Sequence, residues 1–477
     1  MLKNIEKKKL FISGKWQESS EYYELKSPYS DEVIAIVPLT SASEVEEALD
    51  SAERGAQVIK NMTSLERSEI LEKVSRLFQE RSEEAAIILA KECAKPLKAA
   101  RAEIARTIET YKFAAEEAKR IHGETIPMDA AKNGKGRFAY TIREPLGIIA
   151  AITPFNFPFN LVAHKLGPAI AAGNSVVLKP ASQTPLSALL TAEIFEKAGL
   201  PADVLNVVIG KGSVIGDQLL KDQRIKMITF TGSLEVGLGV KEKAGLKKVT
   251  LELGSNSAVI VDSTDDLDFV AARCVEGAYG FAGQVCISVQ RIYVKDELYT
   301  QFLNKFIEKT KQLVIGDPMS EDTDFSAMIH QSEAKRVESW LHEATESGAV
   351  ITYGGKRNNA VLQPTIVTAG SAELSINCKE AFAPIVNITP YKTFDEAIEF
   401  VNDANYGLQA GIYTTSVQKA FDAANRMEVG GVMINDIPTY RVDQMPYGGV
   451  KNSGTGREGI KYSVEEMTEL KLVTFKL

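Results

Sequence analysis

Hydrophobic and polar positions in the first quarter of the chain follow the helical period. Between residues 44 and 120, apolar residues recur every three or four positions in SEILEKVSRLFQE and KAARAEIARTIETYKFAAEEAKR, with charged residues between them. This spacing places the apolar side chains on one face of a helix. The pattern Ser43-Glu44-Val45-Glu46 has the spacing of a capping box, so we expect the first helix to open there. The segment is predicted to be a layer of amphipathic helices.

From residue 147 the pattern changes to short apolar runs that alternate with helical segments. The runs GIIAAIT, NSVVLKP, VLNVVIG, KMITFTG and KVTLELG are separated by segments such as FNLVAHKLGPAIAAG and PLSALLTAEIFEKAG. Alternation of this kind predicts a parallel sheet covered by helices on both faces. A second alternating region starts at NSAVIVDSTD and continues to about Gly430, which predicts another α/β unit and a boundary near Gly254.

Two strand-like segments belong to neither unit, namely GKGRFAYTIRE at 134–144 and the carboxy-terminal TELKLVTFKL. Strands outside a core commonly pair with each other or with another subunit. We therefore predict an α/β protein with three parts: a discontinuous parallel-sheet domain at 1–120 and 145–253, an α/β domain at 254–440, and small β elements at 121–144 and 460–477.

Composition and charge narrow the class of protein. The 477 residues are 44% hydrophobic and 25% charged, with a net charge of −8. These values are typical of a globular protein without a basic surface for nucleic acid. No run approaches the roughly 20 apolar residues of a membrane span, and the four cysteines are scattered. We expect a cytoplasmic enzyme with no nucleic-acid or membrane partner and no metal site.

Three polar residues lie where α/β proteins commonly carry their chemistry. Cys286 follows Gly280 and Gly283, which we expect to leave room for a substrate; Glu252 ends the run TLELG; and Asn156 lies in the turn TPFNFP after GIIAAIT. A thiolate is a nucleophile, a buried carboxyl of raised pKa is a general base, and an amide donates to a developing oxyanion. Each has an ordinary alternative: a buried filler, a helix cap or ion pair, and a turn asparagine.

Six segments occur together, and in the same order, in one known family. They resemble the aldehyde dehydrogenase superfamily and are TPFNFP with Asn156, LKPASQTP with Lys179, FTGS at 230–233, LELG with Glu252, GQVC with Cys286, and KEAFAP with Glu380 and Phe382. The likeness continues through PYGGVKNSGTGREG near the end of the chain. Ordered segments spread over hundreds of residues are far more specific than any single motif.

The resemblance implies oxidation of an aldehyde to a free acid. It assigns Cys286 as nucleophile, Asn156 and the Cys286 backbone N–H as the oxyanion hole, and Glu252 as the base that activates water against the thioester. Family members that pass the acyl group to coenzyme A lack this glutamate. Phosphorylating glyceraldehyde-phosphate enzymes pair their cysteine with a histidine, and no histidine here lies in a matching segment; the four are His122, His164, His330 and His342.

The implied cofactor site lacks a GxGxxG sequence after the first strand of the α/β unit. Instead, FTGSLEVG runs from strand to helix, so that Gly232 permits the turn and Ser233 lies at a helix amino terminus, which attracts phosphate. The resemblance implies that this turn binds the pyrophosphate of NAD(P)+. It also implies that Lys179 and Glu380 bind the two riboses and that Phe382 packs on the nicotinamide side.

Ser182 and Lys211 bear on the choice between NAD and NADP. Relatives that prefer NAD commonly carry glutamate where this chain has Ser182, and that carboxylate repels a 2′-phosphate. Lys211 in IGKGS adds a cationic group, although an exposed loop lysine is more often simply solvated. We expect a slight preference for NADP, with NAD left open.

Arg106 and Arg441 are the candidate substrate-binding residues. They lie in EIARTIETYKF and PTYRVDQMPYGG, which resemble the phosphate-contacting segments of the non-phosphorylating glyceraldehyde-3-phosphate branch. Two arginines in one pocket favour an anionic tail, whereas either alone is more often a surface ion pair. The chain also resembles lactaldehyde dehydrogenases, so a short hydroxyaldehyde, a semialdehyde, and a phosphonate or sulfonate aldehyde all stay open.

Other expectations follow from the same resemblance. The strands at 134–144 and 468–476 look like the family's oligomerisation elements, which implies a homodimer or homotetramer. The alternative function is a catalytically silent or esterase-type protein on the same fold; a silent protein should have lost Cys286, Glu252 or Asn156. Ser255 and Ala383 replace glycines of the usual motifs, and Ser255 would be strained if its position needs a positive φ.

Overall fold

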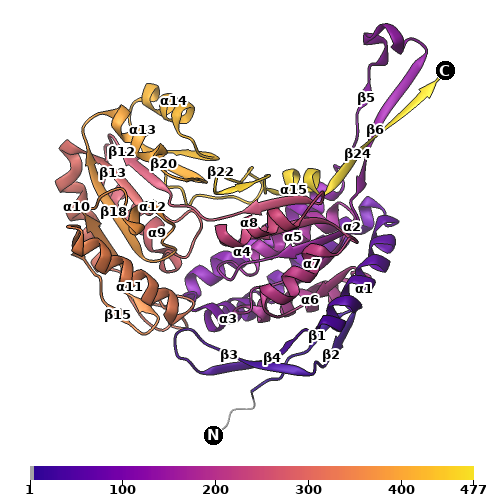
Figure 1. Cartoon of the computed structure of the whole chain (residues 1–477), viewed down its shortest axis with the longest axis horizontal. Coiled ribbons are helices and arrows are strands. Elements are labelled where there is room, and N and C mark those ends of the chain that lie inside the picture. The colour runs from indigo at the N-terminus through magenta and orange to yellow at the C-terminus, as the bar shows by residue number, and fades with distance from the viewer. Residues whose placement is uncertain (1–4) are drawn as a thin grey trace.

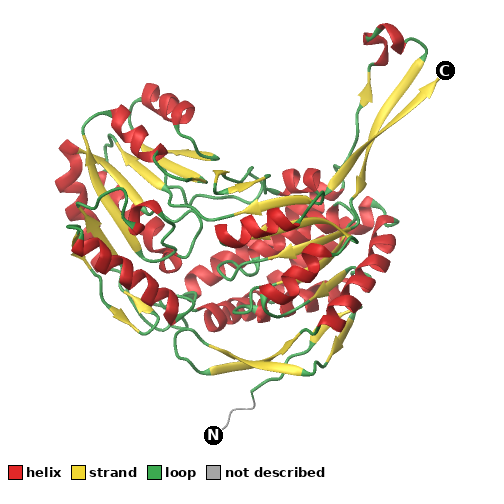
Figure 2. Cartoon of the chain, viewed as in Figure 1, coloured by secondary structure: helices red, strands yellow, loops and turns green. Residues whose placement is uncertain are grey.

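Two sheets organise the chain in the computed structural model, which describes residues 5–477 (Figure 1). Each sheet lies in its own lobe, helices pack against the sheets, and a β arm projects from the lobe that contains the first sheet (Figure 2). The predicted α/β class with parallel sheets is confirmed. Among the helices of residues 5–477, none is long and apolar enough to cross a membrane.

The first sheet has eight strands in the order β2-β1-β9-β8-β7-β10-β11-β23. The strands from β9 to β11 are parallel, and antiparallel pairings involving β1, β2 and β23 complete the two edges. Strands β7 and β8 are buried almost throughout because helices cover both faces. The strands are β1 (Leu10–Ile12), β2 (Lys15–Gln17), β7 (Ile148–Ile152), β8 (Ser175–Lys179), β9 (Leu205–Val207), β10 (Ile225–Thr231), β11 (Lys248–Glu252) and β23 (Gly454–Thr455).

The helices of this lobe include the predicted amphipathic layer. The capping box that opens it was placed two residues too late: Ser41 is the N-cap, and its hydroxyl and backbone N–H exchange hydrogen bonds with Glu44. The helices are α1 (Ala42–Lys60), α2 (Ser64–Glu80), α3 (Ser82–Cys93), α4 (Leu97–Ala118), α5 (Asn160–Ala171), α6 (Pro185–Ala198), α7 (Asp217–Lys221), α8 (Leu234–Lys243) and α15 (Ile460–Glu466).

The second sheet has seven strands in the order β14-β17-β18-β13-β12-β20-β21. All its neighbours are parallel except β14, which runs antiparallel at one edge. The strands are β12 (Ala258–Val261), β13 (Arg291–Lys295), β14 (Val350–Tyr353), β17 (Thr365–Thr368), β18 (Ile385–Tyr391), β20 (Gln409–Tyr413) and β21 (Gly431–Ile434). The helices are α9 (Leu267–Tyr279), α10 (Asp296–Lys311), α11 (Gln331–Glu346), α12 (Ser375–Cys378), α13 (Phe394–Asn402) and α14 (Val417–Arg426).

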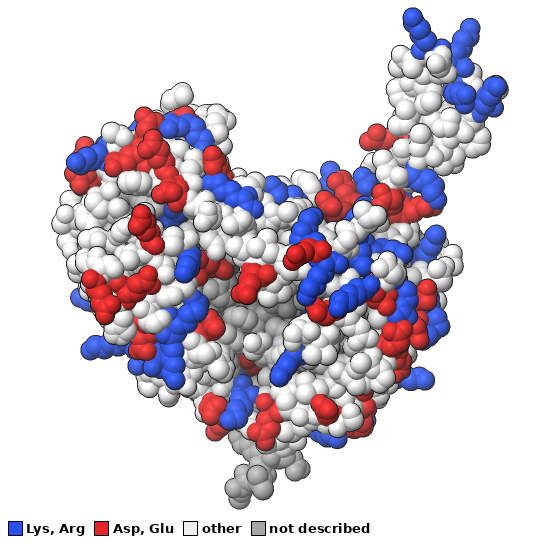
Figure 3. Space-filling view, viewed as in Figure 1, with Lys and Arg blue, Asp and Glu red and all other residues white. Residues whose placement is uncertain are grey.

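The arm contains the two strand-like segments that the sequence set apart. β24 (Thr468–Lys476) pairs along its whole length with β6 (Arg137–Pro145), and β5 (Thr125–Ile126) completes the sheet. Basic side chains gather at its tip (Figure 3). Arg137 and Lys476 lie opposite each other in the register of β6 and β24. Small hairpins are formed by β3 (Glu21–Lys26) with β4 (Val33–Leu39), β15 (Arg357–Asn358) with β16 (Val361–Leu362), and β19 (Tyr406–Gly407) with β22 (Val450–Lys451).

The chain passes from one sheet to the other between Glu252, which ends β11, and Ala258, which starts β12. The division into domains at 1–120 with 145–253 and at 254–440 stays an interpretation. One element lies outside that scheme, because β23 (Gly454–Thr455) returns from beyond residue 440 to pair with β11 next to Glu252.

Candidate active site

Cys286 lies in the loop between α9 and β13, and this loop has unusual backbone geometry. Phe281 and Ala282 have positive φ angles of 48° and 55°, and Gly283 follows with 68°. A Cβ on Gly283 would lie 2.2 Å from the carbonyl oxygen of Ala383. Gly283 therefore lets two backbone segments of the protein come together. That it also leaves room for a substrate stays a prediction.

The sulfur of Cys286 is partly buried beside an aromatic side chain that the sequence interpretation missed. The hydroxyl of Tyr447 lies 2.9 Å from the Cys286 Sγ, and the guanidinium of Arg441 lies 3.7 Å from the centre of the Tyr447 ring. Burial raises the pKa of the Cys286 thiol to about 11, although the Tyr447 hydrogen bond and the charge of Arg441 oppose this rise. A base is therefore needed to form the thiolate near neutral pH.

Hydrogen bonds fix both the side chain and the backbone of Asn156 near the loop that carries Cys286. It lies in the turn after β7, where its Nδ2 donates a 3.0 Å hydrogen bond to the carbonyl of Gln284, two residues before Cys286. Its own carbonyl accepts from the ammonium of Lys95 at 2.6 Å. An amide carries two N–H donors, so the bond to Gln284 leaves one that a substrate oxygen can use.

Glu252 ends β11, as predicted, in a site without hydrogen-bond donors. It is buried, and within residues 5–477 neither carboxylate oxygen has a hydrogen-bond partner. Burial raises its pKa well above the usual range, and the negative charge of Glu458 adds to the effect. A carboxyl of this kind is a strong base once it has lost its proton.

The turn after β10 has the strand-to-helix geometry that the sequence predicted. Ser233 is the N-cap of α8, and its hydroxyl accepts a hydrogen bond from the backbone N–H of Val236. The N–H of Gly232 donates to the carbonyl of Glu252 at 3.1 Å. The amino terminus of α8, with its free N–H groups and favourable dipole, therefore lies next to the end of the strand that carries Glu252.

Lys179 is buried and Glu380 is half-buried, and the surroundings of both suit a polar ligand. The Lys179 ammonium donates a hydrogen bond to the adjacent carbonyl of Pro180 at 3.1 Å, and burial lowers its pKa to about 8. Burial raises the pKa of Glu380 to about 7, although its carboxylate accepts a hydrogen bond from the Ser255 N–H. Any side chain at position 254 would collide with this carboxylate, since a Cβ there would lie 2.1 Å from Oε2.

A small cavity lies beside Glu380, bounded also by Ser255, Gly283, Val285 and Phe382. The Phe382 ring packs edge-on against Phe155. Exposed donors at α8, a buried lysine with spare N–H groups and a carboxylate at a cavity fit a dinucleotide with phosphates and ribose hydroxyls. Neither Ser255 nor Ala383 is among the residues with positive φ, so their replacement of glycine causes no backbone strain there.

Ser182 and Lys211 lie on neighbouring loops. The hydroxyl of Ser182 donates to the carbonyl of Gly210 at 3.0 Å, which places it beside the residue that precedes Lys211. Lys211 is exposed. A hydroxyl at position 182 with an exposed lysine nearby suits a 2′-phosphate better than a glutamate side chain at position 182 would.

Arg106 and Arg441 belong to one hydrogen-bonded set of charged residues, which we call the Arg441 network. It consists of Arg106, Asp443, His164, Arg441, Glu458 and Lys165. Arg106 makes two bonds to Asp443, of 2.6 and 3.2 Å, and Arg441 bonds to Glu458 at 3.1 Å. Each arginine thus forms an ion pair, but the two pairs meet at His164, which is 2.8 Å from Asp443 and 3.4 Å from Arg441.

The interior members of the Arg441 network were not recognised from the sequence. The ammonium of Lys165 contacts Glu458, Thr229 and Thr231. His164 and Lys165 lie on α5, which is buried along its whole length. Two adjacent ionisable residues in the otherwise apolar run FNLVAHKLGPAIAAG were a usable signal, since buried charges are rare unless they are paired.

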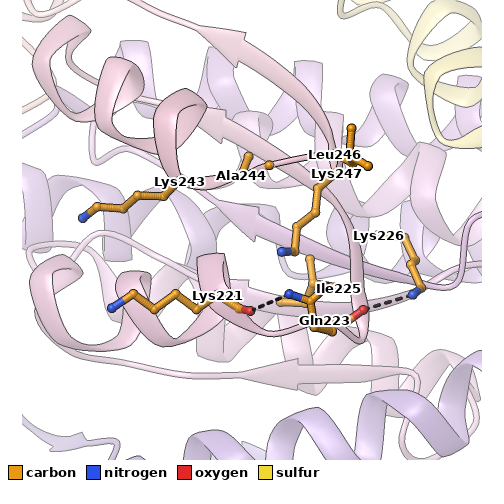
Figure 4. A pocket seen from close by; sticks show the side chains of 9 residues that line it. Lys221, Gln223, Ile225, Lys226, Lys243, Ala244, Leu246 and Lys247 are labelled. Atoms are coloured by element: carbon orange, nitrogen blue, oxygen red, sulfur yellow. Dashed lines mark hydrogen bonds between the residues drawn. The ribbon is translucent and has the colours of Figure 1, made fainter.

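A separate basic cavity of about 420 Å³ lies at the opposite end of β10 from Gly232 (Figure 4). Lys221, Lys226, Lys243 and Lys247 surround it. Ligands of parallel sheets bind at the carboxyl ends of the strands, so this cavity is not part of the candidate active site. Across residues 5–477 there is also no cluster of acidic, histidine or cysteine side chains that could hold a metal.

Comparison with known proteins decides the family. The model of the aldehyde dehydrogenase family matches residues 16–473. The chain belongs to this family. Like other aldehyde dehydrogenases it is an NAD(P)-dependent oxidoreductase that acts on aldehydes, and the resemblance on which the sequence interpretation relied is confirmed.

Individual aldehyde dehydrogenases are similar over nearly the whole chain. A 3-sulfolactaldehyde dehydrogenase from Priestia aryabhattai is 49% identical over 469 residues, which cover 98% of each chain. Aldehyde dehydrogenase 21 from Physcomitrella patens, solved with the reaction product succinate, is 40% identical with a TM-score of 0.97 and 99% coverage of each chain. The glyceraldehyde-3-phosphate dehydrogenase GapN from Methanocaldococcus jannaschii, solved with NADP, is 40% identical with a TM-score of 0.92, covering 96% of this chain and 100% of that one.

Proposed function

We propose that this aldehyde dehydrogenase oxidises a small aldehyde with an anionic tail to the free carboxylic acid, through a thioester on Cys286. One pair of contacts carries the proposal. Arg441 stacks on the ring of Tyr447 at 3.7 Å, and the Tyr447 hydroxyl is 2.9 Å from the Cys286 sulfur. A buried cation therefore lies one aromatic side chain away from the candidate nucleophile.

The first step is attack of the Cys286 sulfur on the aldehyde carbon. Because burial raises the thiol pKa to about 11, its proton must pass to a base as the bond forms. Glu252 is the candidate base, since its unpartnered carboxylate and raised pKa favour proton uptake. Attack yields a thiohemiacetal with negative charge on oxygen.

Asn156 and the backbone N–H of Cys286 are the candidate donors to that oxyanion. The bond from Asn156 Nδ2 to Gln284 fixes the amide beside the cysteine loop before the substrate arrives. The bond from Lys95 fixes the Asn156 backbone. Donors positioned in advance need no reorganisation as charge develops, and this is why they stabilise a transition state.

Gly232, Ser233, Lys179, Glu380 and Phe382 are the residues that would hold the cofactor. Bound NAD(P)+ supplies the acceptor for the hydride that leaves the thiohemiacetal carbon. The Ser182 hydroxyl and exposed Lys211 support a slight preference for NADP, and the GapN relative from Methanocaldococcus jannaschii was solved with NADP. Once Glu252 has passed the Cys286 proton to solvent, it takes a proton from water as that water attacks the thioester, which releases the free acid and regenerates Cys286.

The named relatives support a short anionic substrate. Their names point to 3-sulfolactaldehyde, to glyceraldehyde 3-phosphate, and to succinate as a product. Their tails differ in chemistry but all are anions, which arginine binds through charge-assisted hydrogen bonds. Lactaldehyde is the matching neutral substrate, because it lacks the charged group.

Replacement of Arg441 tests the substrate proposal. Arg441→Met keeps an unbranched apolar side chain and removes the charged guanidinium. We expect kcat/KM for 3-sulfolactaldehyde and succinate semialdehyde to fall much more than kcat/KM for lactaldehyde. Arg273→Met, which removes a cation from an ion pair with Asp436 elsewhere, is the control. Equal losses for charged and neutral aldehydes would contradict an anionic-tail site.

The arm supports a second, structural part of the proposal, namely a homodimer or homotetramer. Strands β6 and β24 expose the apolar side chains of Phe138, Leu470, Leu472 and Phe475. Exposed apolar faces on a projecting sheet commonly pack against another subunit. Light scattering after size-exclusion chromatography would give the mass, and a stable monomer at micromolar concentration would remove this assignment.

A further inference from the structure

We propose that Asp443 and a neutral His164 make the substrate subsite selective for aldehydes with a singly charged tail, a carboxylate or a sulfonate, over the phosphate dianion. The inference rests on the proposed function, because it assumes that the Arg441 network binds the tail. It adds the charge state of the tail, which the arginines alone do not define.

The Asp443 carboxylate accepts hydrogen bonds from three residues. Its Oδ1 accepts hydrogen bonds from Arg106, His164 and Asn160, and its Oδ2 accepts a second bond from Arg106. Burial alone would raise the pKa of Asp443, but the His164 hydrogen bond and the charge of Arg106 hold it far below its usual range. Asp443 is therefore ionised, and it neutralises Arg106.

His164 is neutral because its surroundings provide for only one ring proton. A carboxylate only accepts, so the 2.8 Å contact with Asp443 places the proton on Nε2. Nδ1 is buried, and no donor or acceptor of the described chain reaches it. Protonation of Nδ1 would bury a second N–H without an acceptor. It would also place a positive charge on a ring whose Nε2 lies 3.4 Å from the guanidinium of Arg441. Burial and the charge of Arg441 accordingly lower the pKa of His164.

The other two charged residues of the network, Lys165 and Glu458, form an ion pair. Lys165 uses its three N–H donors on Glu458, Thr229 and Thr231, which is the pattern of an ammonium group. Burial opposes ionisation of Glu458, but the charges of Lys165 and Arg441 outweigh it and lower its pKa. Arg457 lies outside the network, bonded to backbone carbonyls.

The balance leaves one positive charge in excess. Arg106, Lys165 and Arg441 are cations, and within the described residues the anions hydrogen-bonded to them are Asp443 and Glu458. Glu252, whose charge also acts on Arg441 and Lys165, is offset by the nearby Arg457 when it is ionised. A bound carboxylate or sulfonate brings the buried set to neutrality. A phosphate dianion leaves one negative charge without a partner, and an unpaired buried charge costs several kcal/mol in real proteins. Sulfonate and phosphate groups have similar tetrahedral shapes, so charge rather than fit separates them.

The test compares 3-sulfolactaldehyde with glyceraldehyde 3-phosphate at pH 8, where the phosphate is a dianion because its second pKa is about 6. We expect the wild-type enzyme to have the higher kcat/KM with the sulfonate. Asp443→Asn and His164→Lys each add one positive charge to the network by a different route. Both should raise the ratio of kcat/KM for phosphate to that for sulfonate by about tenfold or more, which corresponds to ~1.4 kcal/mol.

Matched controls distinguish the effect of added charge in the network from a general effect of substitution. Asp436→Asn breaks the equivalent Asp–Arg pair with Arg273, and His342→Lys adds a lysine on exposed α11; neither should change the ratio. If a network variant fails to fold, the wild-type ratio and the other variant decide. A wild-type preference for the phosphate, or an unchanged ratio in the folded variants, would overturn the inference. A wild-type enzyme that favours lactaldehyde over both anions would instead overturn the anionic-tail site itself.

Discussion

The hydroxyl of Tyr447 lies 2.9 Å from the sulfur of Cys286, and the face of the same ring carries the guanidinium of Arg441 at 3.7 Å. Tyr447 thus joins the candidate nucleophile to the candidate substrate site. Burial raises the pKa of Tyr447 well above its usual range, so its hydroxyl stays protonated and can donate to a thiolate.

The raised thiol pKa predicts how Cys286 reacts without substrate. Below a pKa of about 11 the thiolate fraction rises about tenfold per pH unit. Inactivation of the cofactor-free enzyme by iodoacetamide should therefore accelerate about tenfold between pH 7 and pH 8, and again between pH 8 and pH 9. Inactivation that is already independent of pH at pH 7 would mean that Cys286 is a stable thiolate.

Glu252→Gln should slow both formation of the Cys286 thiolate and hydrolysis of the thioester, because the amide cannot accept a proton. We expect a steady-state rate at least about 100-fold below wild type at pH 7. At pH 9, where more of the thiol ionises without a base, acylation should recover in part, and at most one reduced cofactor per active site should form before the slow steady state. Mass spectrometry of the quenched enzyme should find the acyl group on the Cys286 peptide.

An exposed carboxylate provides the control for that experiment. Glu276→Gln removes a surface ion pair with Arg273 and should leave turnover unchanged. Full steady-state activity of Glu252→Gln would show that another group activates the water.

Asn156→Ala removes one donor to the oxyanion. We expect kcat to fall about 100-fold to 1000-fold with little change in KM, because the lost hydrogen bond forms only as charge develops on oxygen. The variant also loses the bond from Nδ2 to the Gln284 carbonyl. Thermal unfolding should accompany the kinetics, and a fall in kcat of less than about tenfold in a folded variant would remove Asn156 from the oxyanion hole.

Ser182→Glu should move the cofactor preference toward NAD. The new carboxylate would face the 2′-phosphate next to Lys211, and like charges about 4 Å apart near a surface cost roughly 1–4 kcal/mol. The ratio of kcat/KM with NADP to that with NAD should fall by about tenfold or more. Ser182→Ala is the control and should shift the ratio little. If the glutamate leaves the preference unchanged, position 182 does not face the 2′-phosphate.

The sequence predicted the elements that depend on local pattern. The strand that ends at Glu252, the turn that carries Asn156 and the strand-to-helix passage at Ser233 all lie where periodicity and turn residues placed them. The segments at 134–144 and 468–476 were expected to pair with each other or with another subunit, and β6 and β24 pair with each other in full. These features follow from neighbouring residues and from the alternation rules of parallel sheets.

The sequence could not predict contacts between residues far apart in the chain. Tyr447 reaches Cys286 across 161 residues, and Asp443 reaches Arg106 across 337. Their positions depend on how the two lobes pack, and no local pattern encodes this. The close approach of Gly283 to the backbone of Ala383 could not be foreseen for the same reason.

The most direct test of the account is reduction of NAD(P)+, followed at 340 nm, with 3-sulfolactaldehyde, succinate semialdehyde and lactaldehyde, in the wild-type enzyme and in Cys286→Ala. Cys378→Ala, which removes another partly buried cysteine, is the control. The account predicts turnover by the wild type and the control, faster with the anionic aldehydes, and none above background by Cys286→Ala. Full activity of Cys286→Ala, or a wild-type protein that oxidises none of these aldehydes with either cofactor, would contradict it.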